Sequence, residues 1–244
     1  IISNSEYLVK NPTSYKNKWK ELFKNNNPIC LELGMGRGSF IIEMAKKNPN
    51  INYIGLELDK NQTATAIKNI KDLKLNNLKM ICTDAVEIIN IFGKEIDTIY
   101  LTFSEPWPKK QDAKKRFTAI NYLKLYDRIF KKNKHIILKT DNKILFASSL
   151  ETLSSYWYTF DVVSVDLHKD ERKIDNIMTD FERQYYKEGR QIYIITPMIE
   201  ESDVIEKRYV KSNEKATFED LEDSWYTDAV SWAAQNGIVS GTGE

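Results

Sequence analysis

The sequence predicts an α/β fold built around one mostly parallel sheet. From about residue 28 onward, short apolar runs alternate with amphipathic segments, which is the pattern of successive βαβ units. The chain has 244 residues, enough for one large core and a small appendage. Its residues are 41% hydrophobic and 29% charged, as in globular proteins, and no apolar run approaches the ~20 residues of a membrane helix.

The expected elements follow one another in regular order. A first helix at 14–24 should dock Trp19, Leu22 and Phe23 onto the sheet. Seven strands are expected, at 29–33, 52–58, 78–82, 97–103, 135–140, 160–167 and 190–196. Helices are expected on both faces of this sheet, at 39–47, 60–73, 85–91, 118–131 and 143–156.

Charge divides the chain into a basic body and an acidic tail. Residues 197–244 hold 11 acidic and 4 basic residues, whereas the preceding 196 residues hold 24 acidic and 32 basic ones. We therefore expect one folded domain over 1–196, a linker over 197–217 that begins at Pro197, and a separate helical segment over 218–244. The basic body is compatible with a nucleic-acid partner.

The cysteines and histidines indicate neither disulfides nor a metal site. Cys30 and Cys82 each lie inside an apolar run and are expected to be unpaired thiols, although neighbouring strands would allow them to pair. Free thiols favour a reducing compartment. His135 and His168 are too few, and too far from the cysteines, for a zinc site, so we expect no metal.

A glycine-rich turn joins the first expected strand to the following helix. In LELGMGRG, over 31–38, Gly34, Gly36 and Gly38 permit a tight turn and a close approach of the backbone to a ligand. Dinucleotide-binding enzymes use a similar turn, so the glycines alone are weak evidence. Glu32 discriminates, because a carboxylate would repel a pyrophosphate but would suit the ammonium and sulfonium groups of S-adenosylmethionine.

Two more acidic residues follow the next two expected strands. Glu57 lies 23 residues beyond Gly34, at the distance where a carboxylate reaches ribose hydroxyl groups. Asp84 follows the third strand, where it could accept a hydrogen bond from an adenine amino group. Each acid alone would be read as a solvated loop residue. Three of them at successive strand ends favour a binding site for S-adenosylmethionine.

The fourth expected strand leads into the loop TFSEPWPKK. Prolines on both sides of Trp107 should stiffen this loop and present the indole as a wall for a planar base, unless Trp107 only plugs the edge of the sheet. A basic run follows, and beside an aromatic wall it is a candidate phosphate clamp, although such runs are often only solvated. Its five cations are Lys109, Lys110, Lys114, Lys115 and Arg116.

Over about residues 7–196, these motifs together with LKTDN and TDFE resemble the bacterial tRNA (guanine-N7)-methyltransferase family. The resemblance implies a Rossmann-like class I methyltransferase fold, S-adenosylmethionine as cofactor, and methylation of guanosine 46 in the variable loop of tRNA. The family's cofactor contacts match Glu32, Glu57, Asp84 and Glu105. Its substrate contacts match Lys109, Asp141, Thr179, Asp180, Phe181 and Glu182.

The resemblance also suggests roles for single residues. We expect Asp141 and Glu182 to accept hydrogen bonds from the guanine N1–H and amino group, and Glu105 to lie between cofactor and base as the second catalytic residue. The alternative for Asp141 is a helix N-cap after the fifth strand. The family usually has Asp at the position of Glu105, and Arg-His where this chain has Gln111-Asp112.

Two other functions remain open at this point. Ser-Glu-Pro-Trp loosely resembles the Asn/Asp-Pro-Pro-aromatic loop of amino-group (N6-adenine type) methyltransferases. Residues 218–244 resemble the first half of an S-layer homology module, which would suit a non-enzymatic cell-wall-binding surface protein. We favour the tRNA enzyme, expected in the cytoplasm as a monomer or homodimer without membrane attachment. The sequence does not start with methionine, so the natural start is expected upstream.

Overall fold

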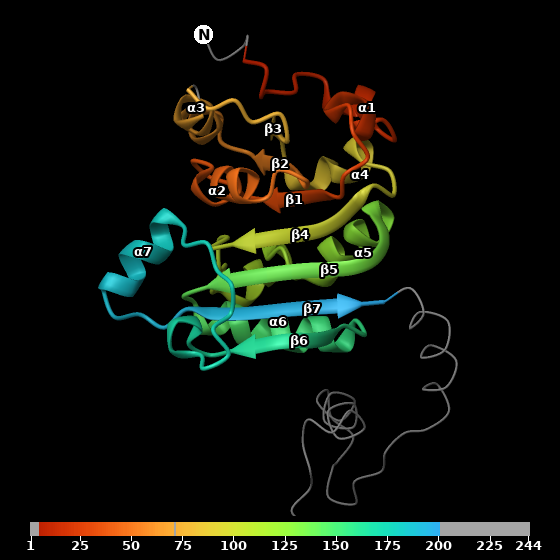
Figure 1. Ribbon diagram of the computed structural model, residues 1–244. Helices are drawn as coiled ribbons and strands as arrows, with labels where there is room; N and C mark the ends of the chain where they lie inside the picture. Colours follow the sequence, from red (N-terminus) through yellow and green to blue (C-terminus); the bar gives the residue numbers. More distant parts are fainter. Residues whose placement is uncertain (1–4, 71, 201–244) are drawn as a thin grey trace, which may run out of the picture.

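The predicted α/β fold with a seven-stranded, mostly parallel sheet is confirmed. The computed structural model describes residues 5–70 and 72–200, and their strands form one sheet in the order β3-β2-β1-β4-β5-β7-β6 (Figure 1). The first five strands pair in parallel, whereas β7 is antiparallel to β5 and β6. The strands are β1 (Ile29–Leu33), β2 (Asn52–Glu57), β3 (Leu78–Cys82), β4 (Ile96–Thr102), β5 (Phe130–Thr140), β6 (Thr159–Ser164) and β7 (Tyr193–Ile199).

Helices cover both faces of this sheet, and each face has its own apolar core. Side chains alternate between the faces along β1, so Leu31 and Leu33 join one core while Cys30 joins the other. The first core includes residues of α1 (Trp19–Phe23), α4 (Ile88–Ile91), α5 (Ile120–Ile129) and α6 (Lys143–Ser155), and the second includes residues of α2 (Ser39–Lys47) and α3 (Lys60–Asn69). Because both faces are covered, every residue of β1 is buried.

Several expected helices are shorter than predicted or divided. The first is split into the 3-10 turn η2 (Pro12–Tyr15) and α1, since Asn17 between them has a left-handed backbone with φ of 65°. Lys24, with φ of 57°, ends α1. Trp19 and Phe23 are buried, as expected. The helix expected at 85–91 is divided into η3 (Ala85–Glu87) and α4. Two further 3-10 turns are η4 (Lys110–Lys115) and η5 (Leu167–Lys169).

The domain extends beyond its predicted end at residue 196. Strand β7 continues through Pro197 to Ile199, so the predicted linker cannot begin at 197. Proline has no N–H to donate to a neighbouring strand, and the register between β6 and β7 shifts between Phe160 and Val162, next to the pairing of Phe160 with Pro197. Residues 201–217 and the predicted helical segment 218–244 lie outside the described residues.

Helix α7 (Asp180–Lys187) was not among the predicted helices. It lies beside the carboxyl ends of β4 and β5 in Figure 1. Its only buried residue is Glu182, and its eight residues include few apolar ones, so the sequence gives a weak helix signal.

Both cysteines are free, and within the described residues no helix is long and apolar enough to cross a membrane. Burial raises the pKa of the Cys30 thiol to about 12, which makes this thiol a poor nucleophile at neutral pH.

Candidate functional site

The candidate site lies where β1, β2, β4 and β5 reach their carboxyl ends, which meet at one edge of the sheet (Figure 1). Strand order reverses between β1 and β4, and open α/β sheets bind ligands at such a reversal. The predicted glycine loop follows β1, the Trp107 loop follows β4, and Asp141 follows β5. Among the described residues, no group of three or more His, Cys, Asp or Glu is placed to hold a metal ion.

The glycine loop makes the predicted tight turn. Gly34, Gly36 and Gly38 have φ of 74°, 54° and 75°, in the left-handed region that side chains disfavour. The amides of Gly34 and Met35 both donate to the carbonyl oxygen of Leu56, at 2.8 and 3.1 Å. The loop is therefore fixed against the end of β2, with α2 beginning directly after Gly38.

Glu57 contacts this loop. Its carboxylate accepts hydrogen bonds from the amides of Gly36 and Asp59, each at 2.9 Å, and remains partly exposed. A carboxylate held between the ends of β1 and β2 lies where it could accept hydrogen bonds from the hydroxyl groups of a bound ribose. Asp84 is exposed and caps η3 by accepting from the amide of Val86 at 3.1 Å.

Glu32 is more deeply buried than a contact at an open edge would be. It is 1% exposed, Thr102 Oγ1 donates to its Oε1, and Oε2 has no hydrogen-bond partner among the described residues. Burial raises the pKa of Glu32 to about 8. An unpartnered carboxylate oxygen beneath the glycine loop is a site where a cationic group would be favourable.

The loop after β4 is held by Arg116. This side chain is 9% exposed, and it donates from Nε to the carbonyl oxygen of Pro106 at 3.0 Å and from Nη2 to that of Trp107 at 2.9 Å. Phe103 and Trp107 have φ of 51° and 42°, so the loop keeps two left-handed non-glycine residues in place. Glu105, between them, is exposed.

The predicted phosphate clamp is therefore smaller than five cations. The prediction that Arg116 binds phosphate is wrong, because its guanidinium donates hydrogen bonds to carbonyl oxygens of the loop. Lys115 lies 4.5 Å from the centre of the Trp107 ring and 2.8 Å from Asp112 Oδ1, so it covers one part of the indole. Lys109, Lys110 and Lys114 are exposed and remain candidates for phosphate contact, as does exposed Lys115 in part.

Asp141 lies after β5 and is paired with Arg190, whose Nη1 donates to Asp141 Oδ2 at 3.0 Å. The alternative that Asp141 caps the next helix is wrong. Asn142 caps α6 by accepting from the amide of Leu145 at 2.9 Å. Arg190, which follows α7 in the sequence, thus holds the half-buried Asp141 carboxylate at the edge of the sheet.

The TDFE motif forms the start of α7. Thr179 caps the helix by accepting from the Glu182 amide at 2.9 Å, and exposed Asp180 pairs with Arg183 at 3.1 Å. Phe181 is 57% exposed and stacks on Tyr185, with ring centres 6.1 Å apart. Glu182 is 0% exposed. It points into the protein, so this arrangement does not support the prediction that its carboxylate contacts guanine directly.

Lys139, Tyr185 and Arg190 belong to the site but were not predicted. Lys139 Nζ donates to Glu182 Oε2 at 2.6 Å. The Tyr185 ring centre lies 5.8 Å from that of Phe103 and 4.5 Å from Arg190 Cζ. Lys139 stands inside LKTDN, the same motif that pointed to Asp141, but a lysine within an apolar strand gave no indication of its partner.

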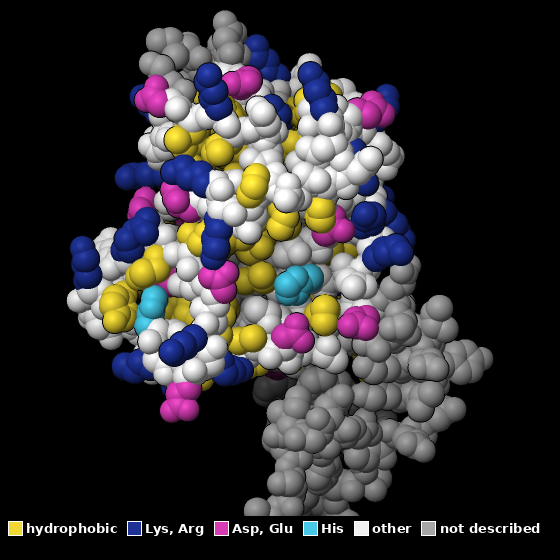
Figure 2. Space-filling model, in the orientation of Figure 1, with side chains coloured by type: hydrophobic (Ala, Val, Ile, Leu, Met, Phe, Trp, Pro, Cys, Tyr) yellow, Lys and Arg dark blue, Asp and Glu magenta, His cyan; other side chains and the backbone are white. Residues whose placement is uncertain are grey.

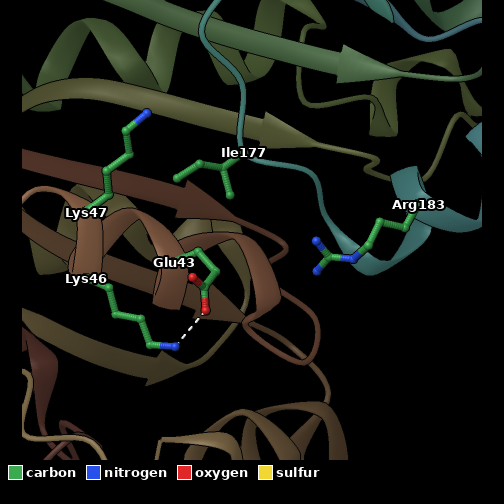
Figure 3. Close-up of a pocket in the computed structure, with 5 residues that line it drawn as sticks. All are labelled: Glu43, Lys46, Lys47, Ile177 and Arg183. Carbon is green, nitrogen blue, oxygen red and sulfur yellow. Dashed lines mark hydrogen bonds and ion pairs between the residues drawn. The ribbon is translucent and has the colours of Figure 1, made fainter.

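Basic side chains gather next to this edge. In Figure 2, Lys and Arg side chains lie over α2 and α7, with Asp and Glu among them. A groove of about 560 Å³ lies between α2 and residues 177–183 (Figure 3). It is lined by Lys46, Lys47, Arg183, Glu43 and Ile177. Lys46 pairs with Glu43 at 2.7 Å and Lys47 with Asp175 at 2.7 Å, so these cations are partly neutralised.

The sequence is similar to known methyltransferases. Residues 26–195 match the family described as "Putative methyltransferase", and residues 217–244, outside the described part of the chain, match the S-layer homology domain. The chain is 42% identical over 194 residues to the tRNA (guanine-N(7)-)-methyltransferase of Bacillus subtilis (strain 168), covering 79% of this chain and 91% of that protein. It is 40% identical over 192 residues to the protein of the same name from Streptococcus pneumoniae (strain 70585), covering 78% and 90%.

Solved structures share the fold at low sequence identity. An antibiotic-related methyltransferase superposes with a TM-score of 0.57 at 16% identity, covering 75% of this chain and 93% of that one. The 16S rRNA methyltransferase KamB gives the same TM-score and coverage at 11% identity. These likenesses concern the fold alone.

Proposed function

The chain belongs to the tRNA (guanine-N7)-methyltransferase family, and from this premise we propose that it transfers a methyl group from S-adenosylmethionine to N7 of a guanosine in tRNA. The observation that carries the proposal is 42% identity across 91% of a curated relative of that name. The carboxylates at successive strand ends support the cofactor, because they suit a cationic ligand without phosphate.

The residues present fit this cofactor. Glu57 would bind the ribose hydroxyl groups, Asp84 the adenine amino group, and the backbone of the glycine loop would approach the ligand without side chains in between. The free Oε2 of Glu32 would face a cationic group. Glu105 would lie between cofactor and base.

Catalysis of this methyl transfer depends more on positioning than on proton transfer. When bound, S-adenosylmethionine supplies an electrophilic methyl group on sulfur, and guanine N7 is a lone-pair nucleophile that carries no proton. The chain therefore needs no general base before attack, and its residues have to hold N7 in line with the methyl carbon. The methylated guanine gains positive charge, which Glu105 and Asp141 would stabilise as carboxylates.

Substrate contacts are assigned to the edge beside α7. Asp141 would accept hydrogen bonds from the guanine N1–H and amino group, and exposed Phe181 offers a face for stacking. Lys109, Lys110 and Lys114 would contact phosphates. Thr179 and Asp180 would contribute through the first turn of α7. As finer parts of the proposal, the target is guanosine 46 in the variable loop, and the protein works in the cytoplasm.

The test is to incubate the full chain with unmodified tRNA and labelled S-adenosylmethionine, digest the RNA, and identify the labelled nucleoside by mass spectrometry. We expect 7-methylguanosine. N6-methyladenosine would instead support the amino-group alternative, and an absence of label in the unmodified tRNA would contradict the proposal. Replacing guanosine 46 by adenosine in a transcript should abolish labelling if the position is correct.

A further inference from the structure

We propose that Lys139 is a positioning residue, which fastens α7 and the segment before it to the catalytic edge through a buried ion pair with Glu182. The proposal rests on the proposed function for its effect on methylation, but the tether itself can be measured without activity. It also gives Glu182 a role different from direct contact with the base.

The ion pair is fully enclosed. Lys139 is 2% exposed and Glu182 0%, and their Nζ and Oε2 atoms are 2.6 Å apart. Lys139 Nζ also donates to Asn176 Oδ1 at 2.7 Å and to the carbonyl oxygen of Ile177 at 2.8 Å. All three protons of this ammonium group thus have acceptors, and every acceptor belongs to the segment 176–182.

Glu182 has further partners besides Lys139. Its Oε1 accepts from Asn176 Nδ2 at 2.5 Å and lies 3.1 Å from His168 Nε2. Charges buried in this way are stabilising only while every partner remains, and removing one partner leaves an unpaired buried charge. Burial lowers the pKa of Lys139, while Glu182 opposes that shift by favouring the charged ammonium.

Besides Glu182, α7 is held by partly buried Tyr185, which packs against the apolar cluster of Leu167, Ile192 and Ile194. Glu182 is its only buried residue, whereas Phe181 and Tyr186 are more than half exposed. Exposed aromatic side chains such as these gain less from the hydrophobic effect than a buried apolar face would. The polar network is therefore the fully buried attachment of α7, in addition to the partly buried contacts of Tyr185.

Lys139 also touches the other loops of the site. Its carbonyl oxygen accepts from the amide of Phe103 at 2.9 Å, at the start of the Glu105 loop. Its register partner on β4 is Thr102, the residue that donates to Glu32. One side chain and its backbone thus connect the loop after β4 with α7.

The test compares Lys139→Met, Glu182→Gln and the double variant with the wild-type full chain. The rate of amide hydrogen exchange in 174–190 measures how firmly the ion pair holds this segment. The kcat, the KM for tRNA and the Kd for S-adenosylmethionine measure the effect of the ion pair on activity and binding. We expect faster exchange in both single variants and a KM for tRNA raised about tenfold or more, the scale of one lost charged hydrogen bond. Cofactor Kd should change less than about twofold in Glu182→Gln, which leaves the β4 side of the network in place.

The double variant should exchange more slowly than Lys139→Met, because it leaves no buried charge without a partner. Lys47→Met is the matched control, since it breaks an exposed ion pair between α2 and Asp175 of this segment and should leave exchange and KM unchanged. If Lys139→Met does not fold, Asn176→Ala removes one bond from each partner and should show the same pattern more weakly.

Two results would overturn the proposal. Unchanged exchange of 174–190 in the single variants would show that the pair is not a tether. A lower kcat in Glu182→Gln with unchanged exchange would show that Glu182 contacts the base directly. Failure of the wild-type chain to form 7-methylguanosine would instead contradict the proposed function, and the exchange experiment would still decide on the tether.

Discussion

The amide of Gly36 donates to Glu57 Oε2 at 2.9 Å, so the acid at the end of β2 and the glycine loop at the end of β1 form one unit. Glu57 also accepts from the amide of Asp59. Both oxygens of the carboxylate are thereby oriented before any ligand binds. Pre-ordering of this kind reduces the entropy cost of binding.

Glu57→Ala should weaken binding of S-adenosylmethionine about ten- to a hundredfold, because hydrogen bonds to a charged group contribute about 1.5–3 kcal/mol. Calorimetric titration of the purified protein measures this. Asp59→Ala is the control, since Asp59 caps α3 from an exposed position two residues away. Equal losses of affinity in both variants would assign the effect to stability and not to contact with the ribose.

Asp141→Ala should lower kcat for tRNA methylation at least about tenfold while leaving cofactor Kd nearly unchanged, as expected for loss of a charged hydrogen bond to substrate. The change also frees Arg190, which is exposed and remains paired with Glu188 at 2.8 Å. Glu43→Ala, which breaks an exposed pair on α2, should leave kcat unaltered. A loss of cofactor affinity in Asp141→Ala would contradict a role in substrate binding.

Glu32→Gln should make stability less dependent on pH. The folded pKa of about 8 lies above the ordinary 4.5, so the folded protein binds this proton more tightly than the unfolded chain. The corresponding stability is fully present below pH 4.5 and is lost as pH rises through 8. Urea unfolding without cofactor should give a slope over this range that flattens in Glu32→Gln but not in Glu87→Gln, an exposed control. Equal slopes in the wild type and Glu32→Gln would contradict the shift.

The sheet was predictable because its signals are local. Apolar runs such as 29–33 and 78–82 correspond residue for residue to β1 and β3. Glycine spacing and acids at strand ends likewise indicated the cofactor edge, since parallel strands bring their carboxyl ends together. Such features need no knowledge of which distant side chains meet.

The remaining features depend on pairs distant in sequence. Lys139 and Glu182 are 43 residues apart, and each alone is expected to be exposed. Helix α7 is short, and its one buried residue is the charged Glu182, so its sequence lacks the run of apolar residues that predicts a helix. Arg116 looked like its basic neighbours in the sequence, and only the structure shows that it turns inward to loop carbonyls.

Arg116→Lys should lower kcat about tenfold or more without changing cofactor Kd. Lysine keeps the charge but lacks the planar fork that reaches the carbonyl oxygens of Pro106 and Trp107 together. The left-handed backbones of Phe103 and Trp107 cost about 1 kcal/mol or more each, and they persist only while the surroundings fix them. Losing the fork should therefore let the loop relax and move Glu105 away from its working position.

Salt dependence separates this role of Arg116 from phosphate binding. Lys114→Gln removes an exposed cation and should reduce the slope of log K for tRNA against log salt by about 1, with little effect on kcat. Arg116→Gln, which removes the charge, should leave that slope unchanged and lower kcat, since a guanidinium bound to loop carbonyls neutralises no phosphate. The two variants should thus show opposite patterns when tRNA binding is titrated between low and moderate salt and kcat is measured in parallel. A reduced slope in Arg116→Gln, with kcat maintained, would show that Arg116 binds phosphate, as its position in the basic run predicted.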